Sequence, residues 1–93
     1  LQTAPHAERL KTSEFTSRLL TACRTEGHGL RKLVRFTWLD ATLRLETQEK
    51  RMDLEATPDG VQATFYVNGE ARHSERVDFT DDPAALARRW LTT

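Results

Sequence analysis

The chain has almost no cysteine, and this scarcity excludes a fold that is held together by internal disulfides. Cys23 is the only cysteine among 93 residues, so the fold must rest on a hydrophobic core. The apolar neighbours Leu19, Leu20 and Ala22 predict that Cys23 is itself a small core residue. A lone thiol of this kind is typical of a reducing compartment, and we expect a cytoplasmic protein.

An excess of one charge and a long hydrophobic run are also lacking. The 14 basic and 14 acidic residues give a formal net charge of +0, so no overall electrostatic field attracts the chain to nucleic acid or to anionic lipid. No apolar run approaches the roughly 20 residues that a transmembrane helix needs. The first residues do not show the charged and then apolar pattern of a signal peptide. We therefore expect no membrane span.

Proline and glycine are scarce, with 3 and 4 residues respectively, so a linker-rich or low-complexity chain is excluded. The few that occur indicate where elements end. Gly27 follows a stretch with helical periodicity and predicts its end. The segments 57–60 (TPDG) and 68–69 (NG) lie between alternating stretches and predict turns. Residues 13–93 are expected to form one domain, and residues 1–12 a tail or a short helical turn.

Two stretches have the periodicity of amphipathic helices. Ser13 is a suitable N-cap for a helix over residues 14–26, in which apolar side chains recur at helical spacing. Asp81 or Asp82 is expected to cap a second helix over residues 83–91, with Pro83 at its first position.

Between the two helices the apolar residues alternate, as in half-buried strands. Strands are predicted over residues 32–39, 42–47, 51–56, 61–67 and 71–79. In the first of them Val34, Phe36 and Trp38 are assigned to the core face. The order of elements predicts an α+β fold with two layers: an antiparallel meander of about four to five strands, with an N-terminal and a C-terminal helix packed on one face.

The register of the second and third strands follows from the rule that opposed residues share a face. The predicted pairs are Leu43–Leu54 and Leu45–Met52 on the inner face, and Arg44–Asp53 and Glu46–Arg51 on the outer face. This register satisfies both faces at once, because it joins apolar residues on one and opposite charges on the other.

The remaining registers depend on the turns. A loop of Asp59 and Gly60 alone predicts the pairs Leu54–Phe65 and Met52–Val67. A bulged turn at residues 68–69 predicts the pairs Val67–Ala71 and Val61–Val77, with His73 opposite Phe65.

No motif indicates catalysis or a cofactor. His6, Cys23, His28 and His73 lack the spacing that places two metal ligands on one face. A Cys23/His28 nucleophile pair is disfavoured because Cys23 lies on the inward stripe of its helix. The pair Asp81 and Asp82 is interpreted as a helix cap. We expect no enzyme, no metal site and no cofactor.

The leading hypothesis is a protein-interaction module of a regulatory, immunity, chaperone or assembly type. Leu33 and Leu39 lie on the face opposite the predicted core side chains of the first strand, and Tyr66 is the one outward aromatic residue. These three are the candidate partner-binding residues. The partner is another protein or a second copy of the chain in a homodimer.

Two alternatives remain. The first is a nucleic-acid-binding domain, in which Arg31, Lys32 and Arg35 contact phosphates beside the aromatic residues that follow. The second is a domain that binds a small ligand or a lipid in a pocket between the helices and the sheet.

Overall fold

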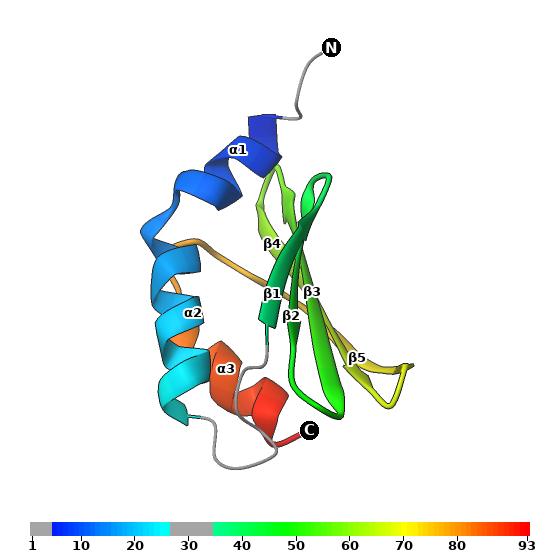
Figure 1. Ribbon diagram of the computed structural model, residues 1–93. Coiled ribbons are helices and arrows are strands. Elements are labelled where there is room, and N and C mark those ends of the chain that lie inside the picture. Colours follow the sequence, from blue (N-terminus) through cyan, green and yellow to red (C-terminus); the bar gives the residue numbers. More distant parts are fainter. Residues whose placement is uncertain (1–4, 27–34) are drawn as a thin grey trace.

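A five-stranded sheet and three helices make up the described part of the chain (Figure 1). The computed structural model describes residues 5–26 and 35–93. Two helices come first and a third comes last, namely α1 (Pro5–Thr12), α2 (Glu14–Glu26) and α3 (Pro83–Leu91). The strands are β1 (Arg35–Leu39), β2 (Thr42–Glu46), β3 (Lys50–Thr57), β4 (Gly60–Val67) and β5 (Glu70–Val77). They form an antiparallel meander in the order β1-β2-β3-β4-β5. The predicted α+β fold is confirmed.

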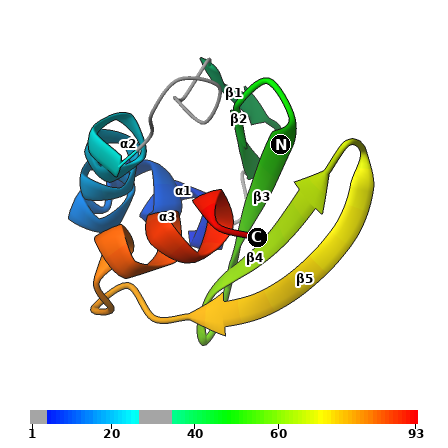
Figure 2. The ribbon, with the colours of Figure 1, turned by 90° about the horizontal axis from the view of Figure 1, so that it is seen from below.

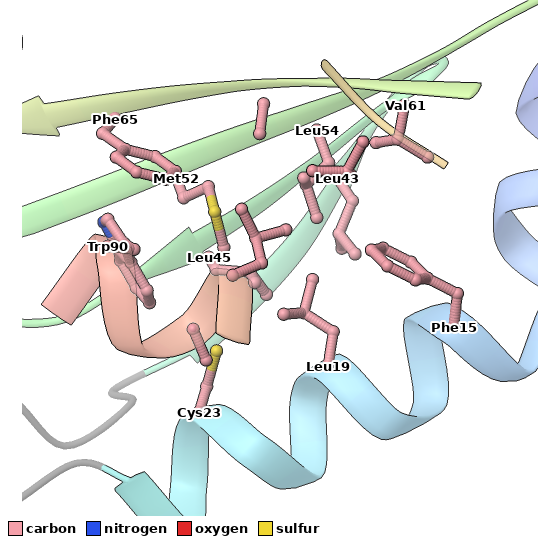
Figure 3. Close-up of a cluster of buried hydrophobic side chains, with 14 of the residues drawn as sticks. Phe15, Leu19, Cys23, Leu43, Leu45, Met52, Leu54, Val61, Phe65 and Trp90 are labelled. Atoms are coloured by element: carbon pink, nitrogen blue, oxygen red, sulfur yellow. The ribbon is translucent and has the colours of Figure 1, made fainter. Parts of the chain in front are cut away.

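The helices form one layer and the sheet forms the other (Figure 2). Helix α2 packs against α3, and α1 contacts both α2 and β3. Sixteen buried hydrophobic residues of the described segments form the core between the layers, among them Leu19 and Cys23 of α2, Leu45 of β2 and Trp90 of α3 (Figure 3). The predicted core position of Cys23 is confirmed, because its side chain is fully buried.

Pro5–Thr12 forms helix α1 within the segment for which the sequence predicts a tail or a short helical turn. Leu10 anchors it in the core with a fully buried side chain. The chain then turns at Ser13, whose Oγ accepts a hydrogen bond from the Phe15 N–H at 3.0 Å and so caps α2 as predicted. The Thr16 hydroxyl donates to the Leu10 carbonyl and ties the two helices together.

The register predicted for β2 and β3 is confirmed at all four pairs. The register predicted for β3 and β4 is wrong, since Met52 lies opposite Phe65 and Leu54 opposite Ala63. Gly60 is the reason: it already pairs with Thr57 within the sheet, which leaves Pro58 and Asp59 as the loop. Gly60 has a φ of +152°, and a Cβ there would lie 2.4 Å from the Val77 carbonyl oxygen of β5, so the sheet has room only for glycine.

Between β4 and β5 the extra residue lies in the strand and not in the turn. Asn68 and Gly69 form a strict two-residue turn with φ values of 51° and 82°, both in the left-handed region that this sequence tolerates. Val67 therefore pairs with Glu70, and the predicted pair Val67–Ala71 is wrong. A bulge next to Tyr66 then restores the predicted pairs, which are Phe65–His73 and Val61–Val77.

Candidate functional site

Among the strands that the structure describes, β1 and β5 are the edges of the sheet, and each pairs with one described neighbour. Within residues 5–26 and 35–93 no strand covers the other side of either edge. An edge strand presents a row of backbone N–H and C=O groups that can pair with another chain, and proteins commonly protect such edges with charges, prolines or bulges. The side chains on the two edges therefore indicate which of them is available for pairing.

The β5 edge is protected in two of these ways. The bulge leaves Arg72 without an opposite residue on β4 and breaks the regular backbone spacing. Charged or polar side chains are exposed along the strand, with Arg72 3.8 Å from Glu70 and Arg76 3.4 Å from Asp59. An incoming strand at β5 would meet an irregular backbone and would desolvate several charges.

The β1 edge has the opposite character. It pairs with β2 in unbroken register over all its residues. Its side chains include Phe36, which is 42% exposed, and Leu39, which is 40% exposed, and these are the large hydrophobic side chains that remain exposed in the described part of the chain. Phe36 shares a face with its opposite residue Leu45, which faces the helices, whereas Leu39 lies opposite Thr42 on the outer face. The edge thus offers an apolar contact on each side of the sheet.

The exposure of Phe36 corrects its assignment to the core. The register places Phe36 on the inner face as predicted, opposite the fully buried Leu45. However, α2 packs against α3 and α1 packs against β3, so the helical layer is centred away from β1 (Figure 2). Phe36 is therefore absent from the core cluster, whereas Trp38 packs partly buried against it.

The three predicted partner-binding residues do not form one patch. Leu33 lies outside the described residues. Leu39 is at the end of edge strand β1, and Tyr66 is on β4, with β2 and β3 between them. Tyr66 is also half-buried, because the Arg51 guanidinium lies over its ring at 3.9 Å from the centroid.

Trp38 connects β1 to the helices. It lies on the inner face opposite Leu43, and the Lys11 ammonium is 5.5 Å from the centroid of its ring. A surface hollow of about 330 Å³ opens beside it, lined by side chains of the α1–α2 junction and by Leu20. The inner side of the β1 edge is thus a half-open apolar surface, formed by Phe36 and Trp38.

The outer face of the sheet carries paired charges. Arg35 Nε is 2.9 Å from a Glu46 carboxylate oxygen, and Arg44 Nε is 3.0 Å from Asp53. The hydrogen bond that Arg44 donates to the Asp53 carboxylate raises the pKa of Arg44 above its ordinary value. Among the cations proposed to bind nucleic acid, Arg31 and Lys32 lie outside the described residues, and Arg35 is held by Glu46. The described outer face therefore shows compensated charge.

Reactive and metal-binding groups do not converge in the described residues. Cys23 is fully buried, and desolvation raises the pKa of its thiol from 9.0 to about 12, so the thiol is protonated at neutral pH and is a poor nucleophile. His28, its candidate partner, lies outside the described residues. Residues 5–26 and 35–93 contain no group of three or more His, Cys, Asp or Glu side chains arranged to hold a metal ion.

Asp81 and Asp82 serve structural roles at the start of α3. Asp82 caps this helix by accepting a hydrogen bond from the Ala84 N–H, as predicted for one of the two aspartates. Asp81 accepts a hydrogen bond from the Asp78 N–H in the preceding turn. In the part of the chain that the structure describes, no helix is long and apolar enough to cross a membrane.

Comparison of the chain with protein-family models, with curated proteins and with solved structures finds no match.

Proposed function

We propose that the chain is a non-enzymatic protein-interaction module that binds an extended segment of a partner protein at the β1 edge. The observation that supports this most directly is the position of Phe36 and Leu39. The two large exposed hydrophobic side chains of the described residues lie on the same edge strand, one on each face. Exposed apolar side chains on an edge strand of regular register are typical of a strand that pairs with another chain.

The binding mode follows from the geometry of an edge strand. A partner segment would extend the sheet by hydrogen bonding to the β1 backbone, and these bonds supply affinity without regard to sequence. Specificity would come from the side chains of the partner segment, which would alternate between two contacts: the Phe36–Trp38 surface on the inner face of the sheet and Leu39 on the outer face. A module of this kind suits the regulatory, immunity, chaperone or assembly roles that the sequence predicts.

The two alternative functions have weaker support. A nucleic-acid site would depend on Arg35, whose guanidinium is already bound to Glu46. A nucleic-acid site with about three to four phosphate contacts would bind weakly, with a log–log salt slope of only roughly −3. Tight and steeply salt-dependent binding of a single-stranded oligonucleotide would need more phosphate contacts than that, and it would contradict our proposal. A ligand pocket between the helices and the sheet would need space that fully buried side chains such as Leu19, Leu45 and Trp90 already fill.

Site-specific photo-crosslinking tests the proposed docking edge. A photo-reactive amino acid would replace Leu39 on β1 and, as the matched control, Ala71 on β5, which is also exposed and on the outer face. The tagged protein would be irradiated in the cells that produce it, and adducts would be identified by mass spectrometry. We expect a discrete protein adduct at position 39 and none at position 71. Equal labelling at both positions, or none at position 39, would contradict the proposal.

An identified adduct needs a second measurement with purified components. Phe36→Lys places a charge on the apolar edge and should weaken binding of the crosslinked partner at least tenfold, whereas Ala71→Lys should leave the affinity unchanged. Neither Phe36 nor Ala71 belongs to the core cluster, so both variants are expected to keep the fold. An affinity that is indifferent to Phe36→Lys would place the binding site elsewhere on the surface.

A further inference from the structure

The side chains of β1 are complementary to themselves, which identifies a specific occupant for this edge. We propose that β1 pairs antiparallel with β1 of a second copy of the chain, so that two sheets join into one across a two-fold axis at Thr37. This inference rests on the proposed function, because it takes the β1 edge as the docking surface and names the partner that binds there.

The register of the pair is fixed by the alternation of the two faces. A shift of one residue would place the core-facing side chains of one copy on the outer face of the other. Among the registers that keep the faces aligned, one alone pairs all five residues of Arg35–Leu39. In this register Thr37 lies opposite Thr37 of the partner subunit. A slip of two residues in either direction would pair only three residues of each strand.

The side-chain contacts of this register are favourable on both faces. On the inner face Phe36 lies opposite Trp38 of the partner subunit, and the symmetry repeats this aromatic pair. On the outer face Arg35 lies opposite Leu39 of the partner subunit. The Arg35 guanidinium remains bound to Glu46 at 2.9 Å, while its aliphatic stem can cover the leucine. The register opposes no two like charges.

The rest of the molecule agrees with a dimer that closes. The formal net charge of +0 gives two copies no overall repulsion. The opposite edge, β5, carries a bulge at Arg72 and exposed charges, so a third copy has no second regular edge to join. A two-fold pair of β1 strands therefore ends assembly at two copies and does not propagate a fibre.

The size of the contact predicts a weak dimer. Arg35–Leu39 contributes five residues a side, whereas a standard stable interface uses about 20–30 residues a side. We therefore expect an equilibrium between monomer and dimer that depends on protein concentration in the micromolar range or above, and not a permanent dimer.

Disulfide trapping tests the register directly. In an antiparallel pair, opposed Cα atoms are about 4.5–5.5 Å apart, within the range that a disulfide spans. Thr37→Cys should therefore crosslink two copies under mild oxidation. Leu39→Cys is the matched control, because the two residues 39 would be four positions apart along the strands, about 13 Å. Wild type reports any contribution of Cys23, which its full burial and protonated thiol should prevent.

Sedimentation velocity provides the second arm, without any introduced cysteine. Wild type should shift from monomer to dimer with concentration, Phe36→Lys should lower the dimer affinity at least tenfold, and Ala71→Lys should behave as wild type. Circular dichroism would verify that each variant is folded.

Two results would overturn the self-pairing. The first is a monomer at every concentration together with no crosslink in Thr37→Cys. The second is a dimer that Phe36→Lys leaves unchanged. Neither result bears on docking of a different partner at β1, which fails separately if position 39 gives no photo-adduct.

Discussion

At the scale of single residues, Trp90 is the side chain on which the packing of α3 depends. It is the largest fully buried side chain of the described residues, and it belongs to the same core cluster as Phe65 and Met52 of the sheet (Figure 3). Trp90→Ala should lower the free energy of unfolding by roughly 3–5 kcal/mol, because it removes buried apolar area and leaves a cavity. The measurement is the midpoint of denaturant unfolding.

The matched control at this position is Trp90→Phe. It keeps most of the aromatic volume and removes the Nε1–H, a buried donor that has no hydrogen-bond partner among the described residues. It should therefore cost clearly less than Trp90→Ala. A midpoint that hardly moves in Trp90→Ala would place the indole outside the core and contradict the packing.

Burial of the Cys23 thiol should make the folded domain less stable at alkaline pH. Its folded pKa of about 12 lies above the ordinary value of 9.0 because burial penalises the thiolate. Between these two values the folded state holds a proton that the unfolded chain releases, so the free energy of unfolding falls as pH rises from 9 toward 12. Below pH 9 both states are protonated and the effect is absent.

The readout for Cys23 is the difference between wild type and Cys23→Ala, measured by urea unfolding at pH 8 and at pH 10.5. The subtraction removes the titration of lysine and tyrosine, which both proteins share. Wild type should lose more stability than Cys23→Ala between the two pH values. Equal losses would show that the thiol is not desolvated in the folded state.

At the scale of elements, an ion pair between Glu75 and Arg89 connects β5 to α3. The Arg89 guanidinium hydrogen-bonds both carboxylate oxygens of Glu75, at 2.6–3.1 Å, and His73 lies 3.0 Å from one of them. The hydrogen bonds from Arg89, and then that from His73, lower the pKa of Glu75 below its ordinary value of 4.5 although burial opposes this shift. The pair stabilises the contact between the protected sheet edge and the C-terminal helix.

The lowered pKa of Glu75 determines how this stabilisation depends on pH. It is present above pH 4.5, and it is lost as the pH falls from 4.5 through the lower folded pKa. Glu75→Gln should cost about 1 kcal/mol at pH 7, because the pair is bidentate but partly exposed, and clearly less at pH 3. Glu70→Gln on the same strand is the control, since its pair with Arg72 is exposed on both sides. An equal cost of Glu75→Gln at both pH values would contradict the account.

The register of two paired strands could be predicted from the sequence where the residues on both faces of the sheet favour the same pairing. The β2–β3 register was predictable because leucines pair on one face while Arg44 and Asp53 pair on the other. The β3–β4 register was not, because the role of Gly60 depends on the nearby Val77 carbonyl of another strand. Turn residues in the sequence indicate where the chain reverses direction. Which of these residues pair within the sheet depends on tertiary contacts, and this pairing sets the register.

The candidate site was predictable in part. Alternation in β1 correctly assigned Leu39 to the outer face and Phe36 to the inner face. It could not show that Phe36 is exposed, since coverage depends on where the helices pack. The order of the elements held a signal, because the first strand of a meander is an edge unless another segment covers it.

At the scale of the whole molecule, the two sheet edges are unequal. One is charged and interrupted by a bulge, whereas the other is regular and exposes Phe36 and Leu39. The central claim of this account is that the apolar edge is a pairing surface and that a second copy of the chain occupies it.

Amide hydrogen exchange at two protein concentrations tests this claim most directly, because pairing protects the backbone N–H groups that an edge strand otherwise exposes. The protein would be labelled at a concentration well below the dimer midpoint found by sedimentation and at one well above it. We predict that peptides covering Arg35–Leu39 exchange more slowly at the high concentration, while peptides covering Glu70–Val77 do not change. Exchange of Arg35–Leu39 that is independent of concentration, or added protection at β5, would contradict the account.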